Sequence, residues 1–600
     1  MLLRSFFAVA LALKSVLSFS TPRANAPTFP DLYEATIADL QAGLDAGHFT
    51  SVDLVNAYFA RINEVNGELH AVIELNPTAL KLAADLDSQR KAGKKLGPLH
   101  GIPILVKDNI ATRFEDGMNT TAGSYALLNS VVPGDATVTA KLRQAGAIIL
   151  GKTNMSEWAG FGPLAPVGWS GRGGQTTSPY YPKGSACGSS SGSGVAAAIG
   201  LAAATLGTET AGSITCPASY NNVVGVKATV GLTSRTGVVP ASQHQDTVGP
   251  LVRTVTDAAI VLSVIAGKDS ADNYTNAQPD NVPDYTAVLN KDALKGARLG
   301  VPRAVFPDTK YGPVPGAAAF TAALKTMKDL GAILTDPADV PTADDSIANP
   351  AGQIVLNTDL KVGIQAYLAT LKDIPTNVHT VADIAAFNDA HKDLEEPALD
   401  AYVEYNLYFG LAETAQVNDA YLQAVQTDRD LGGSKGIDAV LKQHNLDALV
   451  LPMSGFMYVL AGIVGYPIVT VPLGFQANDT VPADAGGKDE PLETAPGIPF
   501  GLTFVGTAFS ESKLLAFAYA YEQATQTRLK RKAYDAATPK TQLVDVVGKN
   551  STTTGGGNST ITGSDGAPSG TTTGAAISMS ISQGLRFVFA SLVFVQGFFG

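Results

Sequence analysis

Cysteine is almost absent from this chain, which has only Cys187 and Cys216 in 600 residues. Two cysteines cannot build the disulfide framework on which small secreted domains depend, but a chain of this length can bury a large apolar core without one. The pair can form a single bridge if their loops meet, or remain as two buried thiols. The sequence alone leaves both states open.

Basic clusters are equally scarce. The net charge is −12, and the one short basic run is RLKRK at 528–532. Because phosphate binding needs a broad basic surface, we expect no nucleic-acid partner. The sequence also lacks a metal-ligand cluster, a phosphate-binding glycine loop and a nucleotide-binding fingerprint, so we expect neither a metal nor another cofactor.

Both ends of the chain resemble processing signals. Arg4 precedes an apolar stretch at 6–13, and Ser18 and Ser20 follow it. This pattern predicts a signal peptide over residues 1–20 that is cleaved after Ser20. A second candidate, cleavage after Ala26, would leave a proline directly behind the cut.

The C-terminal segment 585–600 is apolar and follows small residues and a polar spacer. That order predicts a GPI-anchor signal over residues 576–600, which is removed in the mature protein. A plain C-terminal membrane helix is the alternative. With the signal peptide, the anchor predicts a secreted protein at the cell surface, held on the plasma membrane or cell wall through a lipid.

A stretch rich in Ser, Thr, Gly and Asn joins this signal to the rest of the chain, and we assign residues 541–575 to it. Its composition cannot bury enough apolar surface to fold, so it is interpreted as a stalk. Sequons for N-glycosylation agree with secretion and lie at Asn119, Asn273, Asn478, Asn550 and Asn558.

Residues 27–540 alternate helical and strand patterns without a long linker, which predicts an α/β layered domain with a mixed sheet. Apolar runs of four or five residues predict buried strands at 102–106, 147–150, 448–451 and 468–471. Helical periodicity predicts helices after Ser51, over 135–144 and after Ser510, with both serines as N-caps.

Three separated blocks contain the residues that suggest chemistry. GIPILVKDNI at 101–110 ends an apolar strand on Lys107, GKTNMSEWA occupies 151–159, and 188–219 places small residues around Ser189 and Ser213. In this order and spacing the blocks resemble the amidase signature family of serine hydrolases, in its secreted fungal form. The segments near Pro452 and Pro496 resemble the C-terminal half of that family. The resemblance implies a single large α/β/α domain whose mixed central sheet is covered by helices on both faces.

The resemblance also implies the roles of the residues. Ser213 would attack the amide carbon and form an acyl-enzyme, so that the chain would hydrolyse a carboxamide C–N bond in a small-molecule substrate. Ser189, on a cis peptide bond in the family, would relay the proton to Lys107, which must be neutral to accept it. An oxyanion hole would use the backbone N–H groups of Thr210, Ala211, Gly212 and Ser213.

The sequence departs from the family pattern at three positions around the proposed nucleophile. Ala211 replaces a glycine, Glu209 an aspartate and Thr215 an arginine, although no member of the triad is lost. One alternative is therefore a cell-surface binding or wall protein that has the amidase fold without activity. Another is the amide-hydrolysing subunit of a tRNA amidotransferase, against which the signal peptide argues.

A different hydrolase mechanism must also be weighed. Residues 188–192 match G-x-S-x-G, the nucleophile elbow, and His244 is a candidate base for it. An elbow requires a strand directly before it, which the proline and glycine of YYPKGSAC make improbable. For substrate specificity, the loops at 158–175 and 453–464 are the expected determinants.

Overall fold

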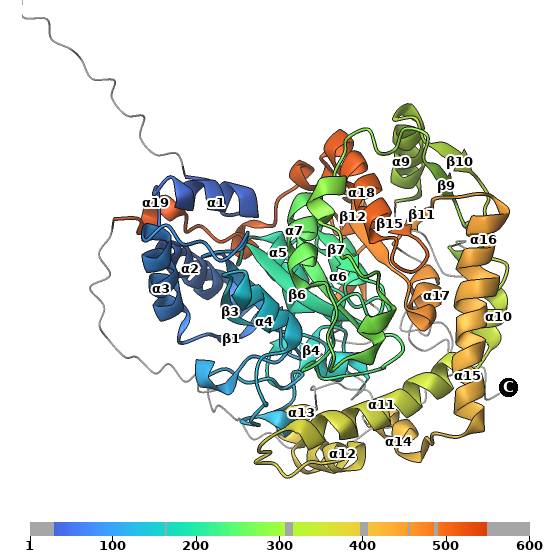
Figure 1. The fold of residues 1–600 in the computed structure, drawn as a ribbon, viewed down its shortest axis with the longest axis horizontal. Helices are drawn as coiled ribbons and strands as arrows, with labels where there is room; N and C mark the ends of the chain where they lie inside the picture. Colours follow the sequence, from blue (N-terminus) through green and yellow to red (C-terminus); the bar gives the residue numbers. More distant parts are fainter. Residues whose placement is uncertain are drawn as a thin grey trace, which may run out of the picture.

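A mixed sheet of eleven strands runs through the middle of the molecule (Figure 1). The computed structural model describes residues 29–161, 165–306, 316–396, 406–453, 456–484 and 490–548. In spatial order the strands are β1 (Val72–Leu75), β3 (Ile148–Thr153), β2 (Pro103–Lys107), β6 (Ala204–Glu209), β8 (Thr247–Val252), β7 (Val224–Lys227), β12 (Ile468–Phe475), β15 (Pro499–Val505), β11 (Ala448–Pro452), β9 (Arg298–Gly300) and β10 (Ile333–Thr335). The middle strands are buried along their whole length, as the continuous apolar runs predict.

Helices cover both faces of this sheet. On one face α5 (Ser191–Ala198) and α6 (Thr215–Tyr220) pack against each other and against the central strands. On the other face lie α4 (Thr137–Gln144), α7 (Val255–Ile265) and α18 (Glu511–Thr525). The predicted α/β/α architecture with a mixed sheet is therefore confirmed.

The remaining elements lie around this sandwich. At the sheet's β1 end are α1 (Ile37–Asp45), α2 (Ser51–Leu69), α3 (Ala79–Lys91) and α19 (Leu543–Val546), and toward its β10 end is α9 (Ala317–Asp329) (Figure 1). Two small hairpins are formed by β4 (Trp169–Ser170) with β5 (Gly174–Gln175) and by β13 (Ala483–Asp484) with β14 (Leu492–Thr494).

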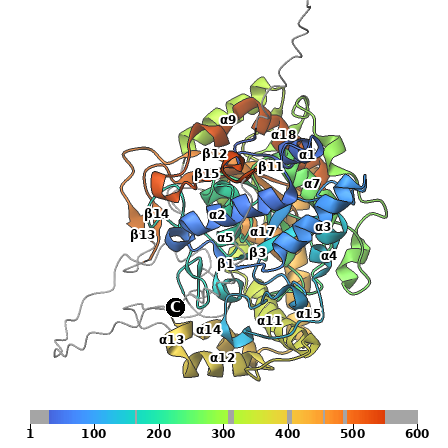
Figure 2. The same ribbon diagram turned by 90° about the vertical axis from the view of Figure 1, so that its left-hand side faces the viewer.

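The chain between β10 and β11 forms a group of helices beside the sheet, below it and to its right in Figure 1 (Figures 1 and 2). It consists of α10 (Ala343–Ala348), α11 (Ala351–Thr370), α12 (Val381–Ala390), α13 (Lys392–Glu395), α14 (Leu407–Thr414), α15 (Asp419–Asp428), the π-helix η7 (Arg429–Ile437) and α16 (Asp438–Gln443). After β11 the chain forms α17 (Met457–Val464). A second apolar cluster, which includes Trp158, Ile364 and Phe409, joins these helices to the loops at 122–127 and 155–158.

The local predictions hold at the level of elements, with one correction at a helix start. All four predicted strands and all three predicted helices are present. However, Thr50 and not Ser51 is the N-cap of α2: its hydroxyl accepts from the amide of Asp53, whose carboxylate accepts from the Thr50 amide in return. Ser510 does occupy the N-cap position of α18, but its hydroxyl donates to the carbonyl of Thr507 and caps no amide.

The boundary of the folded body also differs from the prediction. Residues 541–548, which we assigned to the stalk, are part of the domain: Leu543 is fully buried, and Arg61 donates to the carbonyl of Thr541. The predicted signal peptide, the rest of the stalk and the anchor signal lie outside the described residues. Within the residues that the structure does describe, no helix has the length and apolar character needed to cross a membrane.

Candidate active site

Lys107 lies at the end of β2, inside the protein. Its side chain is fully buried, and its Nζ lies 2.7 Å from Ser189 Oγ and 3.0 Å from Ser190 Oγ. The Oγ1 and carbonyl oxygen of Thr208 are 2.9 and 3.2 Å from the same nitrogen. Burial lowers the pKa of this lysine from its usual 10.5 to about 7, although the carboxylates of Asp246 and Glu209 partly oppose the effect.

The hydrogens around Lys107 distinguish the two neighbouring serines. Ser190 Oγ donates its single hydrogen to the carbonyl of Thr208 at 3.0 Å, and it accepts from the Thr208 amide at 3.2 Å. Ser190 therefore accepts from Lys107 and has no hydrogen left to give. Ser189 Oγ accepts from Lys107 Nζ at 2.7 Å, and its own hydrogen has no acceptor among the described residues. The same contact can therefore run in reverse, from Ser189 to the amine, when Lys107 is neutral.

Ser189 is held in the segment that enters α5. The Gly188–Ser189 peptide bond is cis, as the resemblance implies, and the Ser189 carbonyl accepts from the amide of Ser156 at 3.0 Å. Ser156 belongs to the GKTNMSEWA block, so this bond joins that block to the segment of Ser189. Three residues after Ser189, a Cβ at Gly192 would lie 2.2 Å from the carbonyl oxygen of Ala71, so only glycine fits there.

Ser213 sits on the turn between β6 and α6, and Glu209 fixes the shape of that turn. The buried Glu209 carboxylate accepts from the amides of Gly212, Ile214 and Thr215 at 2.7–2.8 Å. Gly212 has a φ of +86°, in the left-handed region that favours glycine. The replacement of aspartate by Glu209 is thus compatible with a formed turn, since the longer side chain reaches all three amides.

The hydrogen bonds to Glu209 change the predicted set of oxyanion donors. The Gly212 amide is already bound to Glu209, whereas the amides of Thr210, Ala211 and Ser213 have no acceptor among the described residues. The Thr210 hydroxyl donates to Asp246 at 2.6 Å, which anchors the beginning of the turn. Three of the four predicted N–H groups therefore remain free to bind an oxyanion.

Two connections join the Ser189 segment to the Ser213 segment. The Ser190 amide donates to the carbonyl of Ser213 at 3.1 Å. Cys187 and Cys216 form a disulfide, which decides between the two states that the sequence left open. The bridge lies two residues before Ser189 and three after Ser213, so it ties together the two loops that carry the predicted relay and nucleophile.

The nucleophile elbow is not what the structure forms. No strand precedes Gly188, and the Oγ of Ser190, the central serine of that motif, gives its hydrogen to a backbone carbonyl. His244 instead binds Asp359, with its Nδ1 2.8 Å from the carboxylate. Lysine, and not histidine, is the potential base beside these serines.

Sequence reasoning missed a pair of buried carboxyl groups beside the site. Glu157, in the GKTNMSEWA block, and Glu395, at the end of α13, are both buried, and burial together with their mutual repulsion raises the pKa of Glu157 well above its usual value. Burial also raises the pKa of Glu395, which accepts from the hydroxyl of Ser124 and the amide of Tyr125. No periodicity indicates a contact between residues so far apart in the chain.

The two loops expected to determine specificity flank the serine cluster. The loop at 158–175, described except for residues 162–164, contains the β4–β5 hairpin, and its Gly168 amide donates to Ser156 Oγ at 2.8 Å. From the other loop, Tyr458 on α17 lies against Gly212, where an added Cβ would meet its ring at 3.2 Å. Across the described parts of the chain no group of three His, Cys, Asp or Glu side chains could hold a metal ion.

Comparison with known proteins identifies the family. The amidase family model matches residues 53–515. A protein of Arthroderma benhamiae with a provisional amidase name is 44% identical over 530 residues, which cover 84% of this chain and 88% of the relative. The crystal structure of the peptide amidase of Stenotrophomonas maltophilia superposes with a TM-score of 0.74 at 41% identity and covers 84% of this chain and 98% of that one. The chain therefore belongs to the amidase family, whose members hydrolyse C–N bonds.

Proposed function

We propose that the protein hydrolyses a carboxamide through an acyl-enzyme on Ser213, with Ser189 as proton relay and Lys107 as base. The observation that carries this proposal is the buried Lys107 Nζ at 2.7 Å from Ser189 Oγ, with a pKa lowered to about 7. A lysine in this state is substantially neutral near physiological pH and can accept a proton. An exposed lysine could not.

The proposed steps start from the contact between Lys107 and Ser189. Neutral Lys107 takes the proton of Ser189, which takes that of Ser213 while the Ser213 oxygen attacks the amide carbon. The free amides of Ala211 and Ser213 stabilise the negative oxygen of the tetrahedral intermediate, each typically contributing about 3 kcal/mol. The relay then returns the proton to the leaving amine, and water releases the carboxylic acid from the ester by the same route.

Peptide amides are the substrate class that we propose to test first. Similarity to a peptide amidase over most of the chain supports this choice. The ring of Tyr458, which lies against Gly212 beside Ser213, agrees with a substrate that has a partly apolar body.

The experiment combines a covalent probe with a substrate panel. A fluorophosphonate should label Ser213, as located by mass spectrometry of the digested protein, and ammonia release should be measured on aliphatic, aryl and peptide amides with the purified chain alone. Ser213→Ala should abolish both signals. Ser191→Ala is the matched control, because Ser191 belongs to the same cluster but its hydroxyl has no hydrogen-bond partner among the described residues.

Two results would contradict the proposal. Absence of labelling in folded wild-type protein would favour a binding protein with the amidase fold. Labelling of Ser190 in place of Ser213 would return the nucleophile to the 189–191 cluster.

We further propose that the protein is secreted and anchored at the cell surface through a lipid. The terminal sequence patterns support this, and so does the exposure of the sequon residues Asn273 and Asn478 on the folded body. Phosphatidylinositol-specific phospholipase C should release the protein from cells of its source organism. Retention of the full-length chain in the cytosol would refute the proposal.

A further inference from the structure

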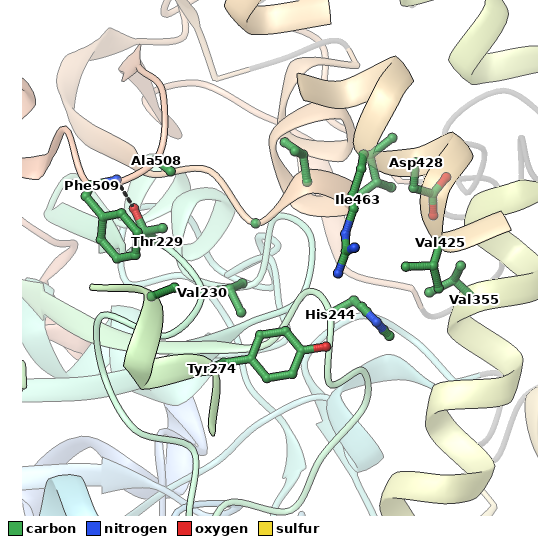
Figure 3. Close-up of a pocket in the computed structure, with 14 residues that line it drawn as sticks. Thr229, Val230, His244, Tyr274, Val355, Val425, Asp428, Ile463, Ala508 and Phe509 are labelled. Carbon is green, nitrogen blue, oxygen red and sulfur yellow. Dashed lines mark hydrogen bonds between the residues drawn. The ribbon is translucent and has the colours of Figure 1, made fainter. Parts of the chain in front are cut away.

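A cavity of about 170 Å³ lies between α15, α17 and the loops at 229–230 and 508–509 (Figure 3). Lys107, Ser189 and Ser213 do not line it. Its wall is largely aliphatic: Figure 3 shows Val355 and Val425 together on one side and Val230 on the opposite side. The volume is slightly larger than the roughly 150 Å³ of a cavity known to admit benzene.

One polar group of this cavity, the carboxyl of Asp428, is unusual because it lacks a partner. Asp428 is 96% buried, since only 4% of its surface is exposed, and its Oδ2 accepts no hydrogen bond from any described residue. Burial, together with the nearby charge of Asp359, raises the pKa of Asp428 to about 7. Buried carboxylates normally have a partner, so a group of this kind at a cavity wall indicates a missing donor.

A positive group lies next to it. Arg429 also lines the cavity. It is an exposed residue, and its guanidinium has neither an ion-pair nor a hydrogen-bond partner among the described residues. Two further groups there have unused positions: the Nε2 of His244, whose Nδ1 is bound to Asp359, and the hydroxyl of Tyr274. The π-helix η7 begins at Arg429, and π-helical turns are frequent at functional sites.

We propose that this cavity is a second binding site, for a small zwitterionic α-amino acid with an aliphatic side chain. The ammonium group of the ligand would bind the Asp428 carboxylate, its carboxylate would bind the Arg429 guanidinium, and its side chain would contact Val355 and Val425. The cavity volume limits the ligand to about the size of valine.

The residues that line this cavity belong to elements that also contact the turn at 210–213. His244 and Asp246 belong to one loop, in which the carboxylate of Asp246 accepts from the Thr210 hydroxyl and from the amide of Ser242. On α17, Ile463 lines the cavity, and the preceding Gly462 lies beside the Thr210 carbonyl. The loop of His244 and helix α17 therefore connect the cavity to the turn that carries Ser213, and through them a bound ligand can affect catalysis.

Isothermal titration calorimetry on the full-length protein tests the site with L-valine. Isovalerate, which is valine without its amino group, and isobutylamine, which lacks the carboxylate, separate the two charges. We expect one valine per chain and at least about tenfold weaker binding of either analogue, because each loses one charge-assisted contact. Asp428→Asn and Arg429→Gln should each weaken valine binding by a similar factor.

Two matched variants keep the test specific. Asp419→Asn removes an exposed carboxylate from the same helix, and it should bind valine as the wild type does. Ser213→Ala should also bind normally. The proposal is overturned if valine gives no heat at millimolar concentration, if isovalerate binds as tightly as valine, or if a covalent adduct on Ser213 blocks valine, since the ligand would then occupy the substrate site.

Discussion

The lowered pKa of Lys107 predicts how kcat/KM depends on pH. If its pKa is about 7 and only the neutral amine accepts a proton, about 1% of the protein is active at pH 5 and about 90% at pH 8. The value of kcat/KM should therefore rise about 90-fold over this interval and then level off. Ammonia release from one amide, measured at constant ionic strength, gives the profile.

The same lysine makes a predictable contribution to stability. Its pKa is lowered in the folded protein, so the folded state binds fewer protons than the unfolded state between about pH 7 and the usual 10.5. The cost of burying it is greatest below pH 7, where it reaches about 5 kcal/mol at about 1.4 kcal/mol per pKa unit. It decreases as the pH rises and is gone above 10.5.

Comparison with Lys107→Met isolates this contribution. The free energy of unfolding of the wild type, minus that of the variant, should increase by up to about 1.4 kcal/mol per pH unit above pH 7 and be constant below it. The buried Lys152 and Lys227 are common to both proteins and cancel in the difference. Lys325→Met, at an exposed lysine on α9, should show no such slope. If the difference in free energy of unfolding between wild type and Lys107→Met does not change with pH, and kcat/KM does not either, Lys107 is not a neutral base.

Four further predictions concern the serines, the turn held by Glu209, the disulfide and the buried carboxyl of Glu395. Ser213→Ala should abolish acylation, and Ser189→Ala should lower kcat by about 10³-fold or more. In the double variant the two losses should not add, because the residues act as a unit. Near-normal turnover of Ser189→Ala would exclude the relay. Glu209→Gln should lower stability by about 1–3 kcal/mol, as measured by urea unfolding, and reduce kcat more than it changes KM, because one backbone amide of the turn loses its acceptor. Cys187→Ala should lower stability by about 3.5 kcal/mol by chain entropy for a separation of 29 residues, a loss that reduction of the wild type should reproduce in thermal denaturation. Glu395→Gln should raise Tm relative to wild type at pH 8 but not at pH 5. Burial raises the pKa of the Glu395 carboxyl, so its ionisation opposes folding only at pH values above its usual pKa. Equal changes in Tm at both pH values would contradict this.

The sequence was sufficient to predict a mixed sheet, and the family resemblance added its cover of helices on both faces and singled out Lys107, Ser189 and Ser213. The sheet was predictable from local patterns, since continuous apolar runs indicate buried strands, and small residues occur where backbone segments approach closely. At Gly207, for example, an added Cβ would lie 2.7 Å from Ser190 Oγ, so that strand can approach the serine loop only with glycine.

What the sequence could not give depends on contacts between distant segments. The clamp by Glu209 looked like a mere departure from the family pattern, because only the folded turn shows that one carboxylate satisfies three amides. The pairing of Glu157 with Glu395 joins segments from opposite halves of the chain, and no periodicity encodes it. The N-cap of α2 was misplaced by one residue, since two adjacent hydroxyl residues, Thr50 and Ser51, both suit that position.

The parallel pairing of β2 with β6 explains how residues a hundred positions apart come to share one site. Val106 is in register with Leu206, so both strands end at the same edge of the sheet. Lys107 is the last residue of β2, and the chain leaving β6 turns directly through Glu209 to Ser213. Parallel neighbours always present their carboxyl ends together, and ligands of α/β sheets bind outside such ends. The sheet itself thus brings the proposed base and the proposed nucleophile to one edge. The proposed relay, Ser189, comes from the loop before α5, which the disulfide ties to α6.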